Sequence, residues 1–465
     1  MLLKTLDLYI GLAGAASLIF VLGIVIYSLR QAIIRRNLVA LLLFISFGLL
    51  LYFKPTYQIL VIAALAIVYI VLVSTGYFAI KSFYLKTKLT KNPPAEYPRI
   101  SILIPAKNEG RVIKESLLSV SRLDYPHSKF EIIVIDDGST DDTYQIISSL
   151  SHIKNLRIVH HPTSHGKANS INEALNEITS EYVVILDADH LIDKRFLKRA
   201  VQDFYRPDIV CVQGKNMVRN GKASLLSRLV ELEYEERYEL IFNGRSSPHF
   251  VGSGAILSTR ILKKIGGFSP VMLTEDFDYS YRVYLNGYKI VFDSTLKTYE
   301  LAPLNIKDFF IQRHRWIRGL WQLLFYYFSD FVKTKKVSFF AKIELSITYW
   351  ESSALVSLLF LNILCLFDLL KFIQFECKYF VYAISLALIL LYIMTIVNYH
   401  KLSRLILLPF IPFYYILYAA PNLMAMIDNW LLKSEYKWNK TDRSAVKDLG
   451  EVLIKEEVAA GYNET

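Results

Sequence analysis

Long apolar stretches lie toward both ends of the chain and flank a middle segment of mixed polarity. Residues 10–29 form an uninterrupted apolar run, which is long enough to cross ~30 Å of hydrocarbon as a helix rising ~1.5 Å per residue. Residues 38–53 and 57–80 are also apolar and are separated only by a short link, which predicts a tight helical hairpin. The pattern therefore predicts three N-terminal membrane spans, of which the second is marginally short.

The C-terminal apolar stretches predict two further spans and a third region with two interpretations. Residues 353–370 and 379–399 have the length and polarity of spans. Residues 405–432 are apolar too, but three prolines interrupt them: Pro409, Pro412 and Pro421. A straight third span would leave the following tail outside the cell, whereas the basic residues of that tail favour the cytoplasm. A proline-broken hairpin or re-entrant segment would satisfy both observations, so both alternatives stay open.

Between the apolar ends, short strand-like runs alternate with helical patterns. The strand-like runs cover residues 100–105, 131–135, 156–160, 182–186 and 209–213, and the helical patterns cover residues 110–121, 141–151 and 167–178. This alternation predicts an α/β domain with a mostly parallel sheet and helices on both faces. Sheets of this kind bind ligands at the carboxyl ends of their strands.

Composition and charge agree with a membrane protein. Hydrophobic residues make up 53% of the chain and charged residues only 20%. The formal net charge is +11, and many basic residues lie in loops beside the apolar stretches, at 30–36 and 81–91. By the positive-inside rule these loops are cytoplasmic, which places the N-terminus outside and the middle domain inside the cell. Anionic lipid headgroups explain the basic residues of these loops and an anionic ligand fits the remaining excess, so we expect no nucleic-acid partner.

Five regions follow from these patterns. They are N-terminal transmembrane helices at 1–92, a cytosolic α/β domain at 93–302, amphipathic interface helices at 303–345, C-terminal transmembrane helices at 346–432 and a polar tail at 433–465. The three cysteines have no paired spacing, which indicates neither a disulfide framework nor a cysteine-ligated zinc site.

Polar clusters follow three of the predicted strands. They are Ala106, Asn108 and Glu109 after the first strand, Asp136 and Asp137 after the second, and Asp187 and Asp189 after the fourth. Such loops meet at one edge of a parallel sheet, where we expect a nucleotide pocket. Asp187 and Asp189 can hold Mg²⁺ or Mn²⁺ through carboxylate oxygens, with Asp189 as the leading ligand. The alternatives are a capped turn with a solvated Asp189, and a helix N-cap beside Asp136 and Asp137.

Three further motifs supply candidate chemistry to the middle domain. Lys167 begins a predicted helix, so it can balance phosphate charge, although a solvated lysine is the more common situation. Gly254 lies in a glycine-rich stretch whose small residues let the backbone approach a sugar. Glu275 and Asp276 come later, and Asp276 is the candidate general base. The alternative for Asp276 is an acidic N-cap of the helix predicted at 277–285.

Gln312, Arg315 and Trp316 are spaced i, i+3 and i+4, so they share one face of a predicted helix. On that face the indole can stack on a sugar ring, the arginine can bind a diphosphate, and the glutamine can bind hydroxyl groups. The alternative is an interfacial helix with a membrane-belt tryptophan and arginines that reach into water.

The order of these motifs resembles that of the processive family 2 glycosyltransferases, which include cellulose, hyaluronan, chitin and poly-N-acetylglucosamine synthases. The motifs are Asn-Glu, Asp-Asp-Gly-Ser, Asp-x-Asp, Thr-Glu-Asp and Gln-x-x-Arg-Trp, and they cover residues 100–316. The resemblance implies a GT-A fold, a UDP-sugar bound at the strand ends, Mg²⁺ or Mn²⁺ held by Asp189, and inverting catalysis by Asp276. It also implies a growing β-linked glycan as the acceptor and coupling of synthesis to secretion across the cell membrane.

The resemblance also implies a role for each motif residue. Glu109 and Asp136 would contact the nucleotide base, Asp187 the uridine, and Lys167 the diphosphate, with Ala106, Asn108, Asp137 and Arg315 also on the donor side. Trp316 would stack on the acceptor sugar, with Gly254, Glu275 and Gln312 beside it. In the tail, Trp438 with the Thr-Asp-Arg that follows is similar to the tail of poly-N-acetylglucosamine synthases.

Two alternative functions remain. One is transfer of a single sugar to a lipid-linked acceptor, such as a polyprenyl phosphate or diacylglycerol. The other is a transporter whose α/β domain senses a nucleotide. The apparent spans carry almost no ionisable residues and no internal repeat, which argues against a transporter.

Overall fold

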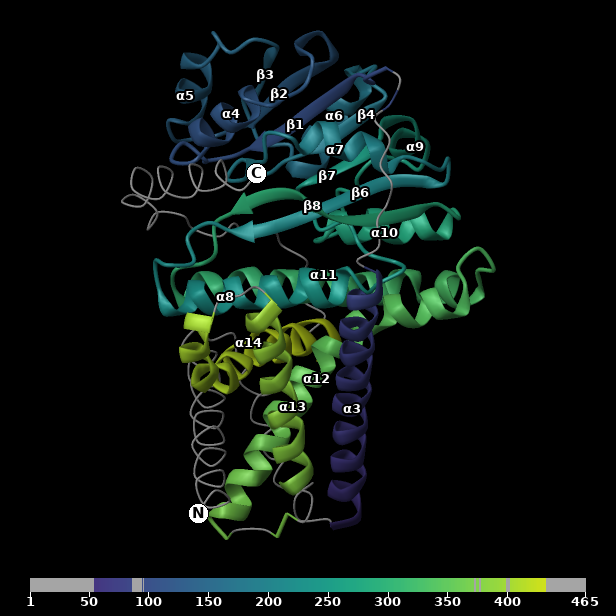
Figure 1. The fold of residues 1–465 in the computed structure, drawn as a ribbon, viewed down its shortest axis with the longest axis vertical. Helices are drawn as coiled ribbons and strands as arrows, with labels where there is room; N and C mark the ends of the chain where they lie inside the picture. Colours follow the sequence, from purple (N-terminus) through teal and green to yellow (C-terminus); the bar gives the residue numbers. More distant parts are fainter. Residues whose placement is uncertain are drawn as a thin grey trace. The chain divides into compact units, whose positions relative to one another are not determined.

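The computed structural model describes residues 54–85, 94, 96–371, 374–375, 378–398 and 402–431 (Figure 1). The predicted spans at 10–29 and 38–53 and the tail motif at Trp438 lie outside the described residues. The chain divides into two compact units. The globular unit contains the described residues within 78–305 and 322–345, and the helical unit contains those within 1–77, 306–321 and 346–441.

An eight-stranded mixed sheet forms the centre of the globular unit, with the order β3-β2-β1-β4-β7-β6-β8-β5. Its strands are β1 (Ile100–Ala106), β2 (Phe130–Asp137), β3 (Leu156–His161), β4 (Tyr182–Ile185), β5 (Leu191–Ile192), β6 (Ile209–Val218), β7 (Ala255–Ser258) and β8 (Lys289–Glu300). All five predicted strands are present. The sheet is mixed but mostly parallel, as predicted: β1 to β4, β6 and β8 run in one direction, and only β7 and the two-residue β5 run antiparallel to their neighbours.

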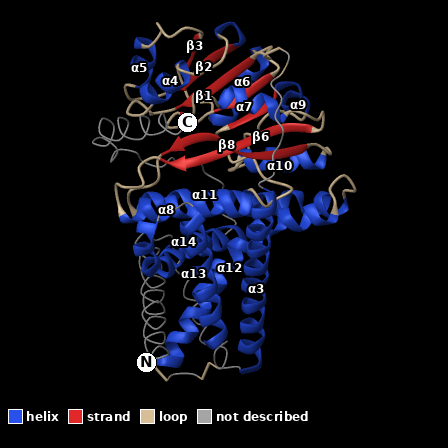
Figure 2. Cartoon of the chain, viewed as in Figure 1, coloured by secondary structure: helices blue, strands red, loops and turns tan. Residues whose placement is uncertain are grey.

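Helices cover this sheet, as Figure 2 shows in blue beside the red strands. They are α4 (Ile113–Ser121), α5 (Thr143–Ser149), α6 (Lys167–Glu177), α7 (Phe196–Ala200), α8 (Leu225–Glu236), α9 (Thr259–Lys264) and α10 (Glu275–Leu285), with short 3₁₀ turns at His127–Lys129 and Val201–Asp203 and a π-helical turn at Arg237–Phe242. Ile102 and Ile104 of β1 pack in one cluster with α4 and α7. Leu103 points to the opposite face and is also fully buried, so both faces of the sheet are covered, as predicted.

The helical unit is built from long apolar helices. Parts of α3 (Lys54–Leu85) and α12 (Phe339–Leu369) pack with α13 (Lys378–Asn398) through one apolar cluster, and α14 (Ile411–Met426) packs on α12 through a second. Three segments are long and apolar enough to cross a membrane: Gln58–Phe78, Phe339–Leu369 and Leu402–Asn429. The predicted span at 57–80 matches the first segment, the one predicted at 353–370 is the C-terminal part of the second, and the region at 405–432 overlaps the third.

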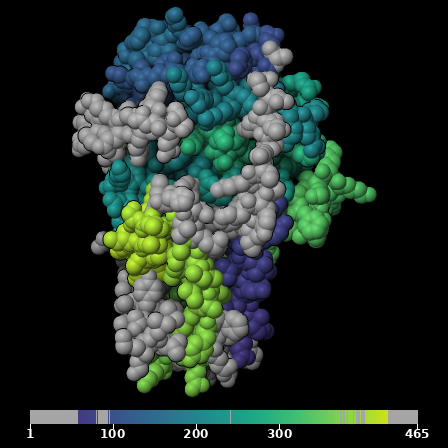
Figure 3. Space-filling model, in the orientation of Figure 1, coloured from purple at the N-terminus to yellow at the C-terminus, as the bar shows by residue number. Residues whose placement is uncertain are grey.

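Large apolar side chains are exposed on these helices. Ile59, Ile62 and Tyr69 of α3 are each more than 60% exposed, and Leu386 of α13 is 57% exposed. Figure 3 shows the outer surfaces of α3 in purple and of α13 in green. A lipid environment accommodates such residues, whereas water does not.

The proline-interrupted region is one helical run that changes its hydrogen-bonding pattern. It passes from a 3₁₀ helix (Leu402–Phe410) through α14 into a π-helical turn (Ile427–Leu431). Pro409 lies in the 3₁₀ helix and Pro421 inside α14. Proline lacks a backbone N–H, which is compatible with such local changes of helix type. The described part of this region contains no hairpin turn, and its crossing of the membrane as a third span or its re-entry stays a prediction.

Candidate active site

The pairing register brings the motif loops to one edge of the sheet. Ala106, at the end of β1, pairs with Asp136 at the end of β2. The two following loops are joined by hydrogen bonds: the Asn108 backbone N–H donates to Ser139 Oγ (2.9 Å), and Asn108 Oδ1 accepts from the Thr140 backbone N–H (2.7 Å). Asn108 has a φ of 55°, a left-handed conformation that asparagine tolerates. The side chain of Asn108 therefore shapes the pocket edge.

Asp136 keeps one carboxylate oxygen available at this edge. The residue is fully buried, and its Oδ2 pairs with His160 Nδ1 at 2.7 Å. Its Oδ1 has no hydrogen-bond partner among the described residues. A buried carboxylate oxygen without a donor is a site that a ligand N–H or O–H can satisfy.

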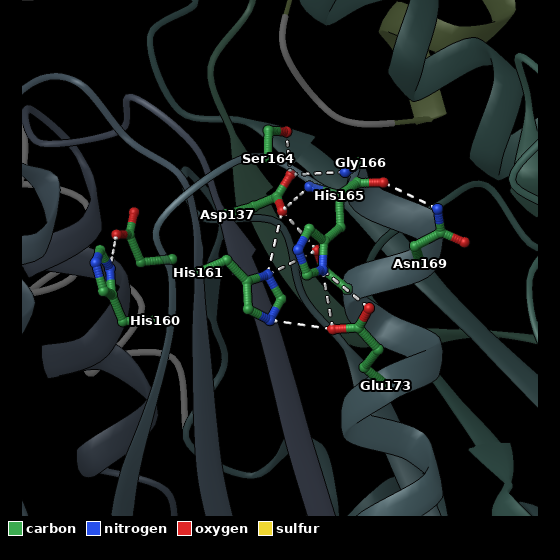
Figure 4. Close-up of polar contacts among 10 residues, drawn as sticks. Asp137, His160, His161, Ser164, His165, Gly166, Asn169 and Glu173 are labelled. Atoms are coloured by element: carbon green, nitrogen blue, oxygen red, sulfur yellow. Dashed lines mark hydrogen bonds and ion pairs between the residues drawn. The ribbon is translucent and has the colours of Figure 1, made fainter.

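Asp137, the next residue, is occupied by the protein itself. Its carboxylate accepts hydrogen bonds from Ser164 Oγ (2.6 Å), the His165 N–H (2.7 Å), the Gly166 N–H (3.0 Å) and His161 Nδ1 (3.3 Å), which Figure 4 shows. Ser170 Oγ donates a further hydrogen bond (2.8 Å). Burial alone would raise the pKa of Asp137, but these hydrogen bonds outweigh it and lower the pKa to about 2. Asp137 thus organises the loop that leads into α6, and its predicted contact with the donor stays a prediction.

Lys167 connects two motifs that lie far apart in the sequence. It is the first residue of α6, and its Nζ lies 2.8 Å from Asp187 Oδ1 and 3.1 Å from Glu275 Oε1. Burial disfavours its charge, but Asp187 and Glu275 outweigh burial and raise the pKa of Lys167. The lysine is therefore a fixed cation between the Asp-x-Asp loop and the Thr-Glu-Asp motif.

Asp187, Asp189 and His190 place three potential metal ligands within 4.8 Å of one another. His190 was not predicted from the sequence, and only its position directly after the Asp-x-Asp motif could have suggested it. Its Nδ1 lies 3.0 Å from Ser253 Oγ and its Nε2 lies 3.1 Å from Glu300 Oε2. Burial opposes a charge on this ring, but Glu300, Asp189 and Asp187 outweigh burial and raise the pKa of His190. Both ring nitrogens of His190 already lie against protein oxygens, and Mg²⁺ and Mn²⁺ prefer carboxylate oxygens, so Asp187 and Asp189 are the ligands that fit these ions.

Asp276 is the second residue of α10 and lies against the backbone of the glycine-rich loop. A Cβ placed on Gly252, whose φ is +87°, would lie 3.0 Å from Asp276 Oδ2. Burial raises the pKa of Asp276 to about 7, repulsion from Glu275 adds to this rise, and Lys167 opposes it. A carboxylate with a pKa near neutrality is suited to act as a general base.

Gly254 has a packing role in the structure. A Cβ there would lie 2.6 Å from Thr298 Oγ1 and 2.7 Å from Asn216 Oδ1, so the protein's own side chains fill the space beside this glycine. The approach of a sugar to Gly254 stays a prediction.

Gln312, Arg315 and Trp316 lie on α11 (Ile306–Lys333), so they do share one helical face, as predicted. They belong to the helical unit and are described within it. The intervening Arg313, which sequence reasoning missed, is fully buried, and its guanidinium carbon lies 4.5 Å from the Trp316 ring and 5.0 Å from the Tyr418 ring. This cation–π stacking fixes the indole that was predicted to bind a sugar.

Comparisons with known proteins agree with these motifs. Residues 101–266 match the family model described as glycosyl transferase family 2. A poly-beta-1,6-N-acetyl-D-glucosamine synthase from Staphylococcus epidermidis is 31% identical over 279 residues, which cover 59% of this chain and 67% of that protein. The synthase of the same name from Staphylococcus aureus is 28% identical over 260 residues, which cover 54% of this chain and 62% of that protein.

The fold also has a solved counterpart. A mannosyltransferase from Pyrobaculum calidifontis, in complex with GDP-Man and Mn²⁺, has a TM-score of 0.57 and 22% identity over 81% of this chain and 99% of its own. At this identity the likeness concerns the fold, which is of the GT-A type, as predicted.

Proposed function

The chain belongs to glycosyl transferase family 2, and from this premise we propose that it transfers a sugar from a UDP-sugar to the end of a growing β-linked polysaccharide. The names of the similar synthases favour N-acetylglucosamine as the sugar and a β-1,6 linkage. One observation carries the proposal: Lys167 forms ion pairs with both Asp187 and Glu275. Directly after Glu275 comes Asp276, a buried carboxyl group whose pKa is raised to about 7.

The donor side is assigned to the sheet edge. We assign the base of UDP to Asp136, whose Oδ1 can accept a hydrogen bond, with Ala106, Asn108 and Glu109 along the same edge. Asp187 and Asp189 would hold Mg²⁺ or Mn²⁺, and the bound ion would supply Lewis-acid stabilisation of the departing diphosphate. Lys167 would exchange part of its contact with Asp187 for phosphate oxygens, because a fixed cation interacts more strongly with a doubly charged group.

The chemical step is a single displacement. Asp276 takes the proton of an acceptor hydroxyl as that oxygen bonds to the anomeric carbon, and UDP leaves with the electron pair of the broken C–O bond. One displacement inverts the anomeric centre, so an α-linked donor gives a β-glycoside. Glu275 keeps Lys167 in place through its 3.1 Å contact. No covalent sugar intermediate is needed.

The acceptor side is assigned to α11. Trp316 would stack on the terminal sugar and Gln312 would bind its hydroxyl groups. Arg315, on the same helix, would belong to the donor side and bind the diphosphate. The cation–π stacking of Arg313 against Trp316 supports this assignment because it holds the indole in one orientation.

The location proposed is the cell membrane, with the globular unit in the cytoplasm. Three described helices are long and apolar enough to span a membrane. The basic loops at 30–36 and 81–91, which lie next to predicted spans, support a cytoplasmic location for the sheet. The proposed organisation of the chain is the five regions predicted from the sequence.

The test uses full-length protein in lipid nanodiscs with UDP-N-acetylglucosamine and Mg²⁺ or Mn²⁺. Wild type is expected to form product of high molecular weight, and Asp276→Asn is expected to lose a factor of about 10²–10⁴ in rate. Asp330→Asn makes the same chemical change at an exposed position and is expected to match wild type. A product carrying one sugar on a lipid would replace the polysaccharide proposal, and turnover by Asp276→Asn at the wild-type rate would reject the general base.

A further inference from the structure

A second group of potential metal ligands lies where β3 leads into α6. His161 ends β3, His165 lies in the following loop and Glu173 lies on α6, and their ligand atoms are within 4.8 Å of one another. His161 Nε2 is 3.1 Å from Glu173 Oε2, and His165 Nδ1 is 2.9 Å from Glu173 Oε1. Figure 4 shows the three side chains converging on one point.

The hydrogen-bonding capacity of His161 does not match its surroundings. Its Nδ1 lies 3.3 Å from Asp137 Oδ1 and its Nε2 lies 3.1 Å from Glu173 Oε2, so each ring nitrogen faces a carboxylate. A neutral imidazole has one N–H, and the second contact then sets a nitrogen lone pair against a carboxylate oxygen. The His165 ring is stacked on the His161 ring with centroids 4.3 Å apart, so a second ring nitrogen lies beside the same carboxylate. A divalent cation between the nitrogen lone pairs and the carboxylate removes this conflict.

We propose that His161, His165 and Glu173 form a zinc site. Asp137 accepts the Nδ1–H of His161, which selects the tautomer with a free lone pair on Nε2, as second-shell carboxylates do at zinc sites. Ligand atoms around a tetrahedral zinc ion with bonds of ~2.0–2.1 Å lie roughly 3.3 Å apart. The observed separations of 2.9 and 3.1 Å are close to this value. Because the two rings are stacked at 17°, the exposed His165 ring would have to turn so that its lone pair points at the same ion as that of His161.

The site is open to solvent and distinct from the Asp-x-Asp motif. The side chains of His165 and Glu173 are 42% and 49% exposed, so an ion has a route of entry. Two imidazoles and one carboxylate suit zinc, whereas Mg²⁺ prefers oxygen ligands alone. The ion would link β3, the loop after it and α6, so its ligands would flank Lys167 in the sequence. The proposal does not depend on the sugar transfer proposed above.

Cobalt binding provides the test. Full-length protein is titrated with Co²⁺, a coloured substitute for Zn²⁺, in excess Mg²⁺ that occupies oxygen-ligand sites. We expect one equivalent with the strong visible absorption of four-coordinate Co²⁺, displaced by Zn²⁺. His165→Ala and Glu173→Gln change exposed side chains, and each is expected to weaken binding tenfold or more. His152→Ala removes an exposed histidine outside the cluster and is expected to bind like wild type.

Asp189→Asn distinguishes the two candidate metal sites. The Co²⁺ absorption is expected to persist in this variant. Absorption that is lost in Asp189→Asn but retained in both His165→Ala and Glu173→Gln would overturn the proposal, and so would wild-type protein whose spectrum shows only free Co²⁺.

Discussion

At the scale of single residues, the protonation of Asp276 sets an expected pH dependence. The base acts as a carboxylate, and its pKa is about 7, so activity is present above this value and is lost as the pH falls through it. We expect kcat/KM to fall about tenfold per pH unit below about pH 7 and to level off above it. Initial rates from about pH 5 to 9 with a fixed metal concentration check this. A profile that is flat across neutrality would mean that Asp276 is not the titrating base.

The same buried charge has a cost in stability. Because the folded pKa of Asp276 is higher than its ordinary value of 3.8, the ionised form is disfavoured in the folded protein, and stability falls as the pH rises from about 4 to 7. Asp276→Asn is therefore expected to raise the thermal unfolding midpoint at pH 8 while it removes activity. An unchanged or lower midpoint in detergent-solubilised protein, relative to the Asp330→Asn control, would contradict this.

Gly252 offers a second test with a matched control. Alanine there must adopt a φ of +87°, and its Cβ would lie 3.0 Å from Asp276 Oδ2. Gly266→Ala meets similar backbone strain at a φ of +94°, but nothing lies within 4 Å of its Cβ. Both variants should lose about 1–2 kcal/mol of stability, and only Gly252→Ala should also lose most of its kcat. Equal kcat values for the two variants would show that Gly252 does not position the base.

Within the globular unit, the sequence could predict which loops meet at the sheet edge but not how each residue there is used. Asp136 and Asp137 are neighbours with the same side chain, yet one keeps an oxygen available and the other is saturated by protein donors. The difference arises because successive strand residues point to opposite faces, and only tertiary structure brings the β3–α6 loop to one of those faces. His190 and Arg313 were missed for a similar reason, since their partners Glu300 and Tyr418 are more than one hundred residues away along the chain.

At the scale of secondary-structure elements, strong local patterns were predictable and weak ones were not. β1 and β2 are buried over nearly their whole length and were found from continuous apolar runs. β7 has only four residues, which give too little pattern to separate it from a loop. β8 pairs with β6 through two register shifts, so its burial does not alternate regularly. Missing these two strands did not change the predicted direction of the sheet, because β8 runs parallel to β6 and only β7 and the two-residue β5 run against the other strands.

The loop from β3 to α6 gives a prediction at this scale. Asp137→Asn replaces an acceptor oxygen by an amide N–H₂ that faces protein donors, so we expect a loss of about 1–3 kcal/mol and weaker UDP binding through displacement of Lys167. The pKa of Asp137 is about 2, below its ordinary 3.8, so its stabilising contribution is full above about pH 4 and is lost toward pH 2. Urea unfolding at pH 7 and at pH 3 should show a smaller difference between wild type and variant at the lower pH.

At the scale of the whole molecule, the sequence indicated a membrane protein from composition alone, and the structure contributes helices with exposed apolar surfaces. The direction in which the spans cross the membrane is predicted from the basic residues of the short loops beside them. Several of those loops lie outside the described residues, at 30–36 and most of 81–91. The proposed function requires the globular unit to face the cytoplasm, and a direct measurement can test on which side of the membrane it lies.

Cysteine labelling provides that measurement. Lys154 lies exposed in a turn of the globular unit, whereas the native Cys211 and Cys365 are buried. Lys154→Cys is expected to react with a membrane-impermeant maleimide in inverted vesicles and to stay unlabelled in intact cells, with wild-type protein giving the background from native cysteines. UDP-sugars and the growing chain would then meet on the cytoplasmic side, and the product would have to cross the membrane during or after its synthesis. Labelling in intact cells would place the sheet outside, where the proposed donor could not be supplied from the cytoplasm, and would reject the proposed coupling of synthesis to secretion.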